Sequence, residues 1–523
     1  MKSNRPINTD DATSVQLLGE CIMPRLQIEQ FANDEAYAAL IMQLVHDHKA
    51  GGFCVFGGTP ETVVMAIHKL QEEAAHSNGV PLIFSADCEF GLPMRLTNGG
   101  TEFPDAMAIA HTGDPELARA AGQAIAKEMK ALGIAWNFAP VADVNSNPKN
   151  PIINTRSFGE DPAIVSSFVV PFMAGLEAEG VAATAKHFPG HGDTSVDSHL
   201  ELPFVEGGWE RFDKIELSPF QALAGAGIQS VMPGHLAAPQ LSEYLGASRE
   251  DQMLPATLSP VIISKLLRER MGFQGVVVTD ALEMRAITNL FGEGEAVVRA
   301  FEAGADVLLM PANPELAFEA LSTALASGRI TFDELREKAA RIGALKKFTR
   351  VENDQIGAKH LRILEKEHAA LAREIAEQAL DCNGEISLHD ATLAILADDR
   401  PEAITKAEKF LDNISTLFTA AKLVKVSDWD ETNIELNSDS ILATFHRARG
   451  YLGGSATNAS VPRIMARIAE DLAGRGVKLR GLILFGSPYL GEEFEVEPGF
   501  VLKTFSESLA SIEAVTKKLL AIP

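Results

Sequence analysis

Residues 181–199 read VAATAKHFPGHGDTSVDSH, and the interpretation of the whole chain starts from this stretch. Its first four residues form an apolar run that is typical of a buried strand. Pro189, Gly190 and Gly192 exclude a continuous helix after that run, so a loop leaving the end of a strand is expected. The loop carries three histidines, two aspartates and a lysine. Loops that hold ionisable side chains on a rigid scaffold are common places for binding and catalysis, which makes this loop the first candidate site.

Short apolar runs alternate with helical patterns from the N-terminus to about residue 350. Apolar residues recur at helical spacing in residues 115–132 and 259–270. The strand candidates are residues 17–23, 52–56, 81–87, 135–141, 181–184, 228–232, 275–280 and 306–310. Strands that are apolar throughout and alternate with helices predict a parallel sheet that is covered on both faces.

Eight such units predict a (β/α)8 TIM barrel, which consists of eight strand–helix pairs. The segment is longer than the ~250 residues typical of this fold, so inserted loops are expected. An open, doubly wound sheet is the alternative. Polar residues at or just after the strand candidates, namely Asp87, His187, His235 and Asp280, favour the barrel. Barrel active sites are built at the carboxyl ends of the strands.

The last third of the chain has the pattern of a smaller α/β domain. Residues 331–348 predict a helix with Thr331 as its N-cap, residues 349–358 a linker, and residues 359–380 a connecting helix. Apolar runs follow at 391–397, 422–426, 440–445, 479–485 and 500–505, with helical patterns at 400–414, 460–475 and 506–520. The expected organisation is therefore a barrel over residues 1–350, a linker and helix over 351–380, and an α/β sandwich over 381–523.

Composition and charge restrict the class of protein. The hydrophobic content of 46% is ordinary for a globular chain, and the formal net charge of −25 argues against nucleic acid or an anionic membrane as a partner. No apolar stretch is long enough to predict a membrane-spanning helix, and the first residues lack the apolar core of a secretory signal. The four cysteines are scattered, with no paired spacing. A reducing, cytoplasmic location is expected.

Asp197, His199 and Asp280 allow two kinds of hydrolytic chemistry. In extended backbone the side chains of Asp197 and His199 project to the same side, and a carboxylate orients a neighbouring imidazole for proton transfer. In a first mechanism Asp280 attacks the anomeric carbon of a sugar while His199 protonates the leaving oxygen. In a second, a divalent metal ion is held by His187, His191, Asp193, Asp197 and His199. Residue types alone leave both mechanisms open.

Several motifs resemble those of bacterial β-N-acetylhexosaminidases of glycoside hydrolase family 3. Residues 186–193 (KHFPGHGD) with residues 197–199 (DSH) are similar to the hallmark of this group. The other similar motifs are residues 87–91 (DCEFG) with Arg95, 156–162 (RSFGEDP), 255–259 (PATLS) and 275–284 (GVVVTDALEM). The resemblance covers residues 16–350 and implies the barrel fold for that part of the chain. The second domain resembles the C-terminal α/β sandwich of two-domain family members more loosely.

The resemblance implies roles for particular residues. Asp280 would be the nucleophile, His199 the general acid/base and Asp197 its partner in a dyad. The hydroxyl groups of the sugar would be held by Asp87, Arg95, Arg156, Lys186 and His187. The resemblance implies neither a metal ion nor a cofactor.

Phe90 and Leu92 depart from the family pattern, which has glycine and arginine at these two positions. The pocket around Asp87 is therefore expected to be reshaped. The reaction itself depends on other residues, so this departure concerns the group next to the sugar.

The expected activity is that of a retaining, exo-acting β-N-acetylglucosaminidase. Its substrate would carry a terminal N-acetylglucosamine, and the resemblance implies a role in recycling cell-wall fragments. The alternatives are a family 3 phosphorylase, because a histidine acid/base does not repel phosphate as a carboxylate would, a β-glucosidase, and the metal-dependent hydrolase described above. Carbohydrate is the expected partner, and neither nucleic acid nor a membrane is expected.

Overall fold

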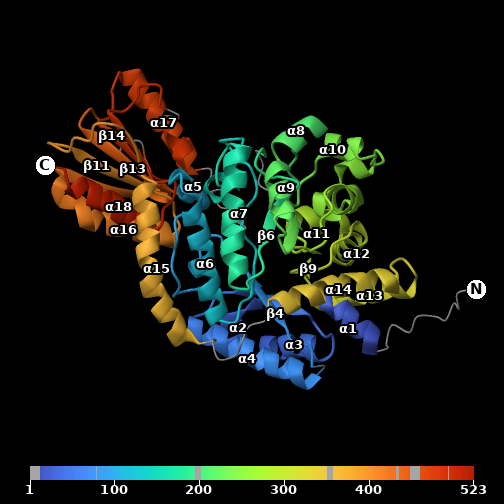
Figure 1. Ribbon diagram of the computed structural model, residues 1–523. Helices are drawn as coiled ribbons and strands as arrows, with labels where there is room; N and C mark the ends of the chain where they lie inside the picture. Colours follow the sequence, from blue (N-terminus) through green and yellow to red (C-terminus); the bar gives the residue numbers. More distant parts are fainter. Residues whose placement is uncertain are drawn as a thin grey trace, which may run out of the picture. The chain divides into compact units, whose positions relative to one another are not determined.

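The computed structural model describes residues 12–77, 79–194, 202–349, 357–430, 435–447, 460–492 and 494–522 (Figure 1). Contacts between residues divide the chain into two compact units. Unit 1 consists of Met1–Thr101, Ala118–Val144 and Asp161–His368, and unit 2 consists of Glu102–Leu117, Asn145–Glu160 and Ala369–Pro523. Two short segments that the sequence assigned to the first domain therefore belong to unit 2.

Unit 1 is built on short parallel strands. They are β1 (Ile22–Met23), β2 (Arg25–Gln27), β3 (Gly52–Phe56), β4 (Ile83–Ala86), β5 (Trp136–Asn137), β6 (Thr184–Phe188), β7 (Ser230–Pro233), β8 (Val276–Val277) and β9 (Leu308–Leu309). They form parallel sheets with the orders β2-β3-β4-β5, β6-β7-β8 and β1-β9. Single parallel bridges join Trp136 to Ala182 and Val278 to Val307. Unit 1 is thus a mixed α/β structure with parallel sheets.

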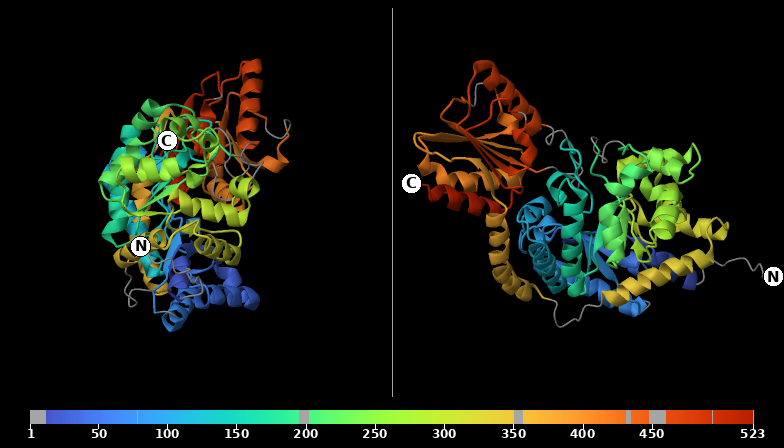
Figure 2. Two further views of the ribbon diagram at one scale, coloured as in Figure 1. Left: turned by 90° about the vertical axis from the view of Figure 1, so that its right-hand side faces the viewer. Right: turned by 45° about the horizontal axis from the view of Figure 1, so that its top comes forward.

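Helices lie between most consecutive strands of unit 1 (Figures 1 and 2). The α-helices are α1 (Ala12–Glu20), α2 (Ile28–Asn33), α3 (Glu35–His46), α4 (Pro60–Ser77), α6 (Pro115–Ala131), α7 (Pro162–Ala178), α8 (Trp209–Lys214), α9 (Ser218–Gly225), α10 (Pro239–Tyr244), α11 (Arg285–Phe291), α12 (Glu293–Ala303), α13 (Pro314–Ala326) and α14 (Phe332–Phe348). Shorter or irregular helical segments are η1 (Leu92–Met94), η3 (Asp251–Met253), η4 (Ala256–Leu258) and η5 (Val261–Arg270). Helix α15 (Ala358–Gln378) begins in unit 1 and ends in unit 2.

Most strands of unit 1 are buried on both faces, as the continuous apolar runs predicted. Every residue of β4, β6 and β7 is buried. The interior also holds polar groups, and they bond to one another: the Trp136 Nε1 group donates to Thr184 Oγ1 and to Ser230 Oγ, each at 2.9 Å. These bonds connect β5, β6 and β7 and leave the indole nitrogen hydrogen-bonded within the core.

Two predicted strand boundaries in unit 1 are wrong. Residues 17–20 belong to helix α1 and not to the first strand, because a short apolar run cannot by itself distinguish a helix end from a strand. Strand β6 continues to Phe188, so Lys186 and His187 lie in the strand and not in the loop after it. Both side chains are buried although they are polar. Each can be buried because it pairs with a carboxylate of another segment, Lys186 with Asp87 and His187 with Asp143.

Unit 2 contains one six-stranded sheet with the order β10-β15-β14-β13-β11-β12. Its strands are β10 (Asp381–Gly384), β11 (Thr392–Ala397), β12 (Ala420–Lys425), β13 (Ser440–His446), β14 (Gly481–Gly486) and β15 (Phe500–Lys503). All neighbouring strands are parallel except β10 and β15. Its helical segments are α5 (Ala106–His111), η2 (Asn154–Arg156), α16 (Pro401–Ile414), η7 (Ser415–Leu417), η8 (Val426–Asp428), α17 (Ser460–Arg475), η9 (Pro488–Gly491) and α18 (Leu509–Leu520).

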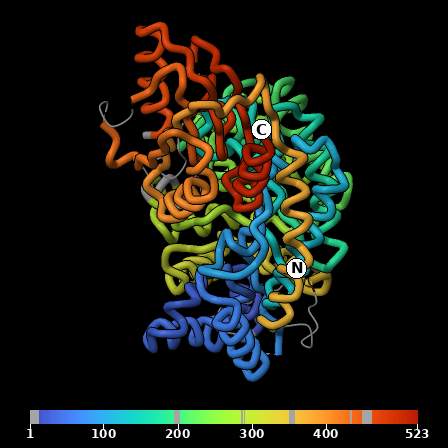
Figure 3. Tube along the Cα trace, turned by 90° about the vertical axis from the view of Figure 1, so that its left-hand side faces the viewer, coloured from blue at the N-terminus to red at the C-terminus, as the bar shows by residue number. Residues whose placement is uncertain are grey.

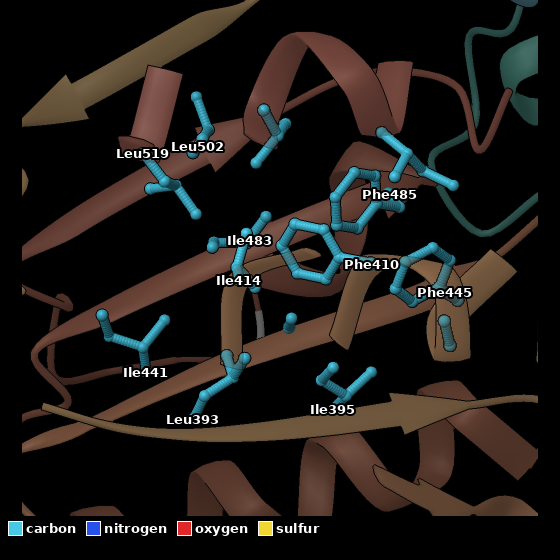
Figure 4. Close-up of a cluster of buried hydrophobic side chains, with 14 of the residues drawn as sticks. Leu393, Ile395, Phe410, Ile414, Ile441, Phe445, Ile483, Phe485, Leu502 and Leu519 are labelled. Atoms are coloured by element: carbon cyan, nitrogen blue, oxygen red, sulfur yellow. The ribbon is translucent and has the colours of Figure 1, made fainter. Parts of the chain in front are cut away.

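Alternate residues of the unit 2 strands face two separate cores. Leu393 and Ile395 of β11 join Phe410 of α16 and Leu519 of α18 on one face (Figure 4). Helices α16 and α18 pack side by side on that face (Figure 3). Leu396 of β11 faces the second core, which includes residues of α17. The sheet is therefore covered by helices on both sides, as in other parallel α/β structures.

Among the described residues, no helix combines the length and the apolar composition that a bilayer crossing would need.

Candidate functional site

Four predicted site residues of unit 1 lie at or just after the carboxyl ends of its parallel strands. Asp87 directly follows β4, Lys186 and His187 lie in β6, and Asp280 is the third residue after β8. Ligands of parallel α/β sheets bind beyond the carboxyl ends of the strands, where the loops leave the sheet. This location makes these side chains the candidate site.

Asp87 is the centre of a cluster of charged side chains. Lys186 Nζ donates to Asp87 Oδ1 at 2.7 Å and forms a second ion pair with Glu89 Oε1 at 2.8 Å. Arg95 also pairs with Asp87 through its guanidinium group. Burial by itself would raise the pKa of Asp87, but the positive charges of Lys186 and Arg95 outweigh burial and hold that pKa below its usual range. Asp87 is therefore ionised at neutral pH and can accept hydrogen bonds from hydroxyl groups.

Neighbouring residues hold this cluster in place. Asn137 in β5 is fully buried, accepts from the Cys88 backbone N–H at 3.0 Å and donates to the Cys88 carbonyl at 3.2 Å. These two bonds fix the backbone next to Asp87. The Arg95 guanidinium lies over the Phe56 ring, 4.4 Å from its centroid. Arg95 thus has an aromatic support as well as an anionic partner.

Asp143 joins the end of β6 to the turn that follows it. Its Oδ2 atom lies 2.7 Å from His187 Nδ1, and its Oδ1 atom accepts from the backbone N–H of His191 at 2.7 Å. Burial would raise the pKa of Asp143, but the neighbouring His187 keeps that pKa below its usual value. For His191, burial lowers the pKa to about 4, against the opposing charges of Asp143 and Asp280. The charge of Asp280 therefore acts on the same turn that Asp143 holds.

The backbone around Asp280 is fixed from two sides. The Ala281 N–H donates to Asp280 Oδ1 at 2.7 Å, and the Leu282 N–H donates to the Leu309 carbonyl of β9 at 3.0 Å. His235, which follows β7, places Nε2 2.9 Å from the Ala281 carbonyl and Nδ1 2.8 Å from Thr257 Oγ1. The Asp280 side chain is partly exposed. A carboxylate on such a fixed backbone suits a nucleophile, because its position changes little when a substrate binds.

The other three predicted site residues do not lie in the described part of unit 1. Arg156 belongs to unit 2, where it is buried at the end of η2 and its Nη1 atom donates to the Ile152 carbonyl at 3.1 Å. Asp197 and His199, the predicted dyad, lie outside the described residues. The structure therefore brings Asp87, Arg95 and Lys186 into direct contact and places His187 next to Lys186 in β6.

The sequence-based site omitted Glu89, Asn137 and Asp143. Glu89 lies two residues after Asp87, and Asp143 follows the apolar run 135–141 in the same way that Asp280 ends the run 275–280. That position at a strand end was the available signal for Asp143. Asn137 gave no such signal, because it lies inside the run and its role depends on Cys88 of another strand end.

Phe90 and Leu92, which depart from the family pattern, are both buried. Leu92 starts η1, and a side chain added at Gly100 would meet its Cβ atom at 2.5 Å. Leu92 therefore packs inside unit 1.

Within the described part of the chain, no three His, Cys, Asp or Glu side chains are grouped closely enough to hold a metal ion. His187 uses Nδ1 for Asp143, and His191 has Nδ1 2.8 Å from Thr194 Oγ1. Two of the five ligands in the metal mechanism, Asp197 and His199, lie outside the described residues.

Comparisons with known proteins find one family over most of the chain. The model of the glycosyl hydrolase family 3 N-terminal domain matches residues 19–345. Over 327 residues the chain is 36% identical to β-hexosaminidase A of Pseudoalteromonas piscicida, which covers 58% of this chain and 54% of that protein. Over 354 residues it is 32% identical to a β-N-acetylglucosaminidase/β-glucosidase of Cellulomonas fimi, which covers 67% of this chain and 61% of that protein. The chain thus spans little more than half of the length of these two relatives.

A solved structure is similar over almost the whole chain. It is the family 3 β-N-acetylglucosaminidase of Paenibacillus sp. str. FPU-7, with a TM-score of 0.78, 29% identity and coverage of 96% of both chains. The similarity therefore includes the elements of unit 2 as well as those of unit 1.

Proposed function

The chain belongs to glycosyl hydrolase family 3, and on this basis we propose that it is a retaining β-N-acetylglucosaminidase that removes terminal β-linked N-acetylglucosamine. The relatives named β-hexosaminidase and β-N-acetylglucosaminidase support this substrate class. The observation that carries the proposal is Asp280, a carboxylate at a strand end whose backbone is bonded on both sides. Recycling of cell-wall fragments and a cytoplasmic location are part of the proposal.

In the proposed reaction Asp280 attacks the anomeric carbon and forms a covalent bond to the sugar. His199, assisted by Asp197, gives a proton to the glycosidic oxygen as the bond to the leaving group breaks. A water molecule then loses a proton to His199 and displaces the sugar from Asp280. Two displacements retain the configuration of the anomeric carbon.

Sugar recognition is assigned to Asp87, Arg95, Arg156, Lys186 and His187. An ionised Asp87 accepts from hydroxyl groups, whereas the lysine and the two arginines only donate. The ion pairs of Asp87 with Lys186 and Arg95 support this assignment, because they orient all three side chains before a substrate arrives.

We also propose that unit 1 is a (β/α)8 barrel. The order of strand pairs, together with the bridges Trp136–Ala182 and Val278–Val307 and the β1–β9 pair, supports a closed ring of parallel strands. The ring has eight strands when β1 and β2, which are separated only by Pro24, are taken as one. The expected domains, residues 1–350 and 381–523 with the connecting segment 351–380, are proposed for the chain as a whole.

The proposal is tested by the choice of substrate and by the fate of Asp280. We expect the purified chain to hydrolyse p-nitrophenyl-β-N-acetylglucosaminide with retention, and to act more slowly on the β-glucoside. Excess EDTA should leave the rate unchanged, and a slowly hydrolysed fluoro-sugar should label Asp280, as mass spectrometry of peptides would show. Loss of activity in EDTA would favour the metal-dependent alternative, and a sugar 1-phosphate formed in added phosphate would favour a phosphorylase.

The variant Asp280→Asn supplies the sharpest single test. It should lower kcat by roughly 10³-fold or more, because the variant lacks the nucleophile that acts together with the acid/base residue. Circular dichroism and the melting temperature check that the variant is folded. A folded variant that keeps most of its activity would exclude Asp280 as the nucleophile.

A further inference from the structure

Asp143 makes four polar contacts with His187 of β6 and His191 of the following turn. It is fully buried and follows β5 by six residues in the sequence. Oδ1 accepts from the backbone N–H of His187 at 3.1 Å and of His191 at 2.7 Å. Oδ2 accepts from the His187 backbone N–H at 3.2 Å and lies 2.7 Å from His187 Nδ1.

These contacts determine where the proton of the His187 ring lies. Each oxygen of Asp143 already accepts a backbone N–H, so the carboxylate acts as an acceptor, and the low pKa of Asp143 agrees with this. His187 Nδ1 must then be the donor in the 2.7 Å contact. Nε2 is left as the second polar atom of the ring, with its orientation fixed by the bond on the other side.

The packing around His187 restricts the ring further. His187 is 7% exposed, and its ring meets that of His191 edge to face, with centroids 5.9 Å apart. A Cβ atom added at Gly234, which follows β7, would lie 3.0 Å from His187 Cβ. Its burial and the contact with His191 leave the ring little freedom to rotate away from Asp143.

We propose that Asp143 is a positioning residue that fixes the proton on Nδ1 of His187 and so determines how Nε2 meets a hydroxyl group of the sugar. This inference rests on the proposed function, because it gives His187 a sugar to contact. A bound sugar would then meet a ring whose orientation and proton position do not have to change on binding. A purely structural Asp143 would hold the turn through the backbone of His187 and His191 but would have no effect on the ring proton.

The variant Asp143→Asn separates these two roles. Its carbonyl oxygen can replace Oδ1 and keep the two backbone bonds, whereas its amide N–H2 group replaces Oδ2 and faces His187 Nδ1. Two N–H groups cannot point at each other, so the ring must move its proton to Nε2. Long-range ¹H–¹⁵N spectra of ¹⁵N-histidine-labelled protein show the position of this proton, with His187→Ala used to assign the signal.

We expect Nδ1 to be protonated in the wild type and Nε2 in Asp143→Asn. The variant should keep its melting temperature within a few degrees and lose roughly 10- to 100-fold in kcat/KM, mainly through KM. This is the range observed when the hydrogen-bond partner of a metal-ligating histidine is removed. In the His187→Ala background, Asp143→Asn should cause no further loss.

Asp306→Asn is the matched control, because Asp306 is equally buried but precedes β9 and bonds Arg268 and the Val277 N–H. It should lower stability without moving the His187 proton.

An Nε2 proton in the wild type, or losses that add fully in the double variant, would overturn the inference. If Asp143→Asn fails to fold, the proton position in the wild type still decides between the two roles. The spectrum does not depend on turnover. An inactive wild type with an Nδ1 proton would therefore reject the proposed function alone.

Discussion

Buried charges lie at both ends of the unit 1 strands. Asp306, just before β9, binds Arg268 at 2.6 Å, and Lys338 in α14 donates to the carbonyls of Phe301 and Ala305. These groups fix helices to strands at the amino ends. Asp87 and Lys186 are also buried and paired, but at the carboxyl ends. Burial and pairing therefore do not identify a site in this molecule, whereas the end of the strand does.

His191 gives a prediction about acid stability. Its pKa is lowered by burial from 6.5 to about 4, so as the pH falls protons bind the unfolded chain first. The free energy of unfolding should therefore be highest above about pH 6.5 and decrease by about 3 kcal/mol as the pH approaches 4. Urea unfolding at pH 7, 5.5 and 4.5 measures this loss, and His191→Gln should reduce its slope. The same substitution at the exposed His68 should leave the slope unchanged, and equal slopes for all three proteins would contradict the prediction.

Part of the site could be predicted from the sequence because some of its residues stand at the ends of apolar runs. Asp87 and Asp280 end apolar runs, so their place at strand ends was predictable. The contacts of Lys186 were not predictable, because they are made with carboxylates far away in the chain, such as Asp87, which precedes Lys186 by 99 positions. The position of Arg156 in unit 2 was not predictable for the same reason.

The turn after β6 depends on Gly190. Its φ angle is +127°, a conformation that L side chains rarely adopt, and an added Cβ atom would lie 2.6 Å from Glu216 Cβ. Gly190→Ala should therefore combine backbone strain with a collision and cost roughly 3 kcal/mol or more. Gly227→Ala is the matched control, with φ +87° and no atom within 4 Å of the added carbon. It should cost about 1 kcal/mol, from strain alone. Denaturant unfolding measures both values, and similar losses would argue against the collision.

Local signals predicted elements best where the chain itself supplies them. Helix α14 begins after Thr331, whose side chain accepts from the Glu334 N–H while Glu334 bonds back, and it ends with Lys346 and Lys347 in its last turn. All of these partners are close in the sequence. Strand β10 was missed because its four residues are mostly exposed and pair only with β15, at the edge of the sheet. Strand β6 was predicted too short because Lys186 and His187 look like loop residues until their partners are known.

At the level of the whole molecule, the chain passes repeatedly between its two units. Segment Asn145–Glu160 of unit 2 carries Arg156, and Tyr489 of η9 contacts both of its ends. Asn145 Nδ2 donates to Tyr489 Oη at 2.9 Å. Burial, together with a hydrogen bond to Glu160, raises the pKa of Tyr489 well above its usual value. The hydroxyl group of Tyr489 thus holds a loop that lies far earlier in the sequence.

On the proposed assignment of Arg156 to sugar recognition, Tyr489→Phe should weaken sugar binding without touching the proposed nucleophile. Loss of these two hydrogen bonds would loosen the Arg156 segment and raise KM by roughly 10-fold, with a smaller effect on kcat. The control is Tyr244→Phe, since Tyr244 is 53% exposed and stacks on Trp209. Steady-state kinetics with p-nitrophenyl-β-N-acetylglucosaminide compare the two variants. Equal KM values would show that Tyr489 does not support the Arg156 segment.

The bond between Asn145 and Tyr489 joins residues that are 344 positions apart. During translation, the ribosome releases the Arg156 segment long before it has synthesised η9. The nascent chain therefore cannot give this segment its final support until synthesis is almost complete. A stop codon between Arg156 and η9 would leave Arg156 in the product and remove the tyrosine that braces it.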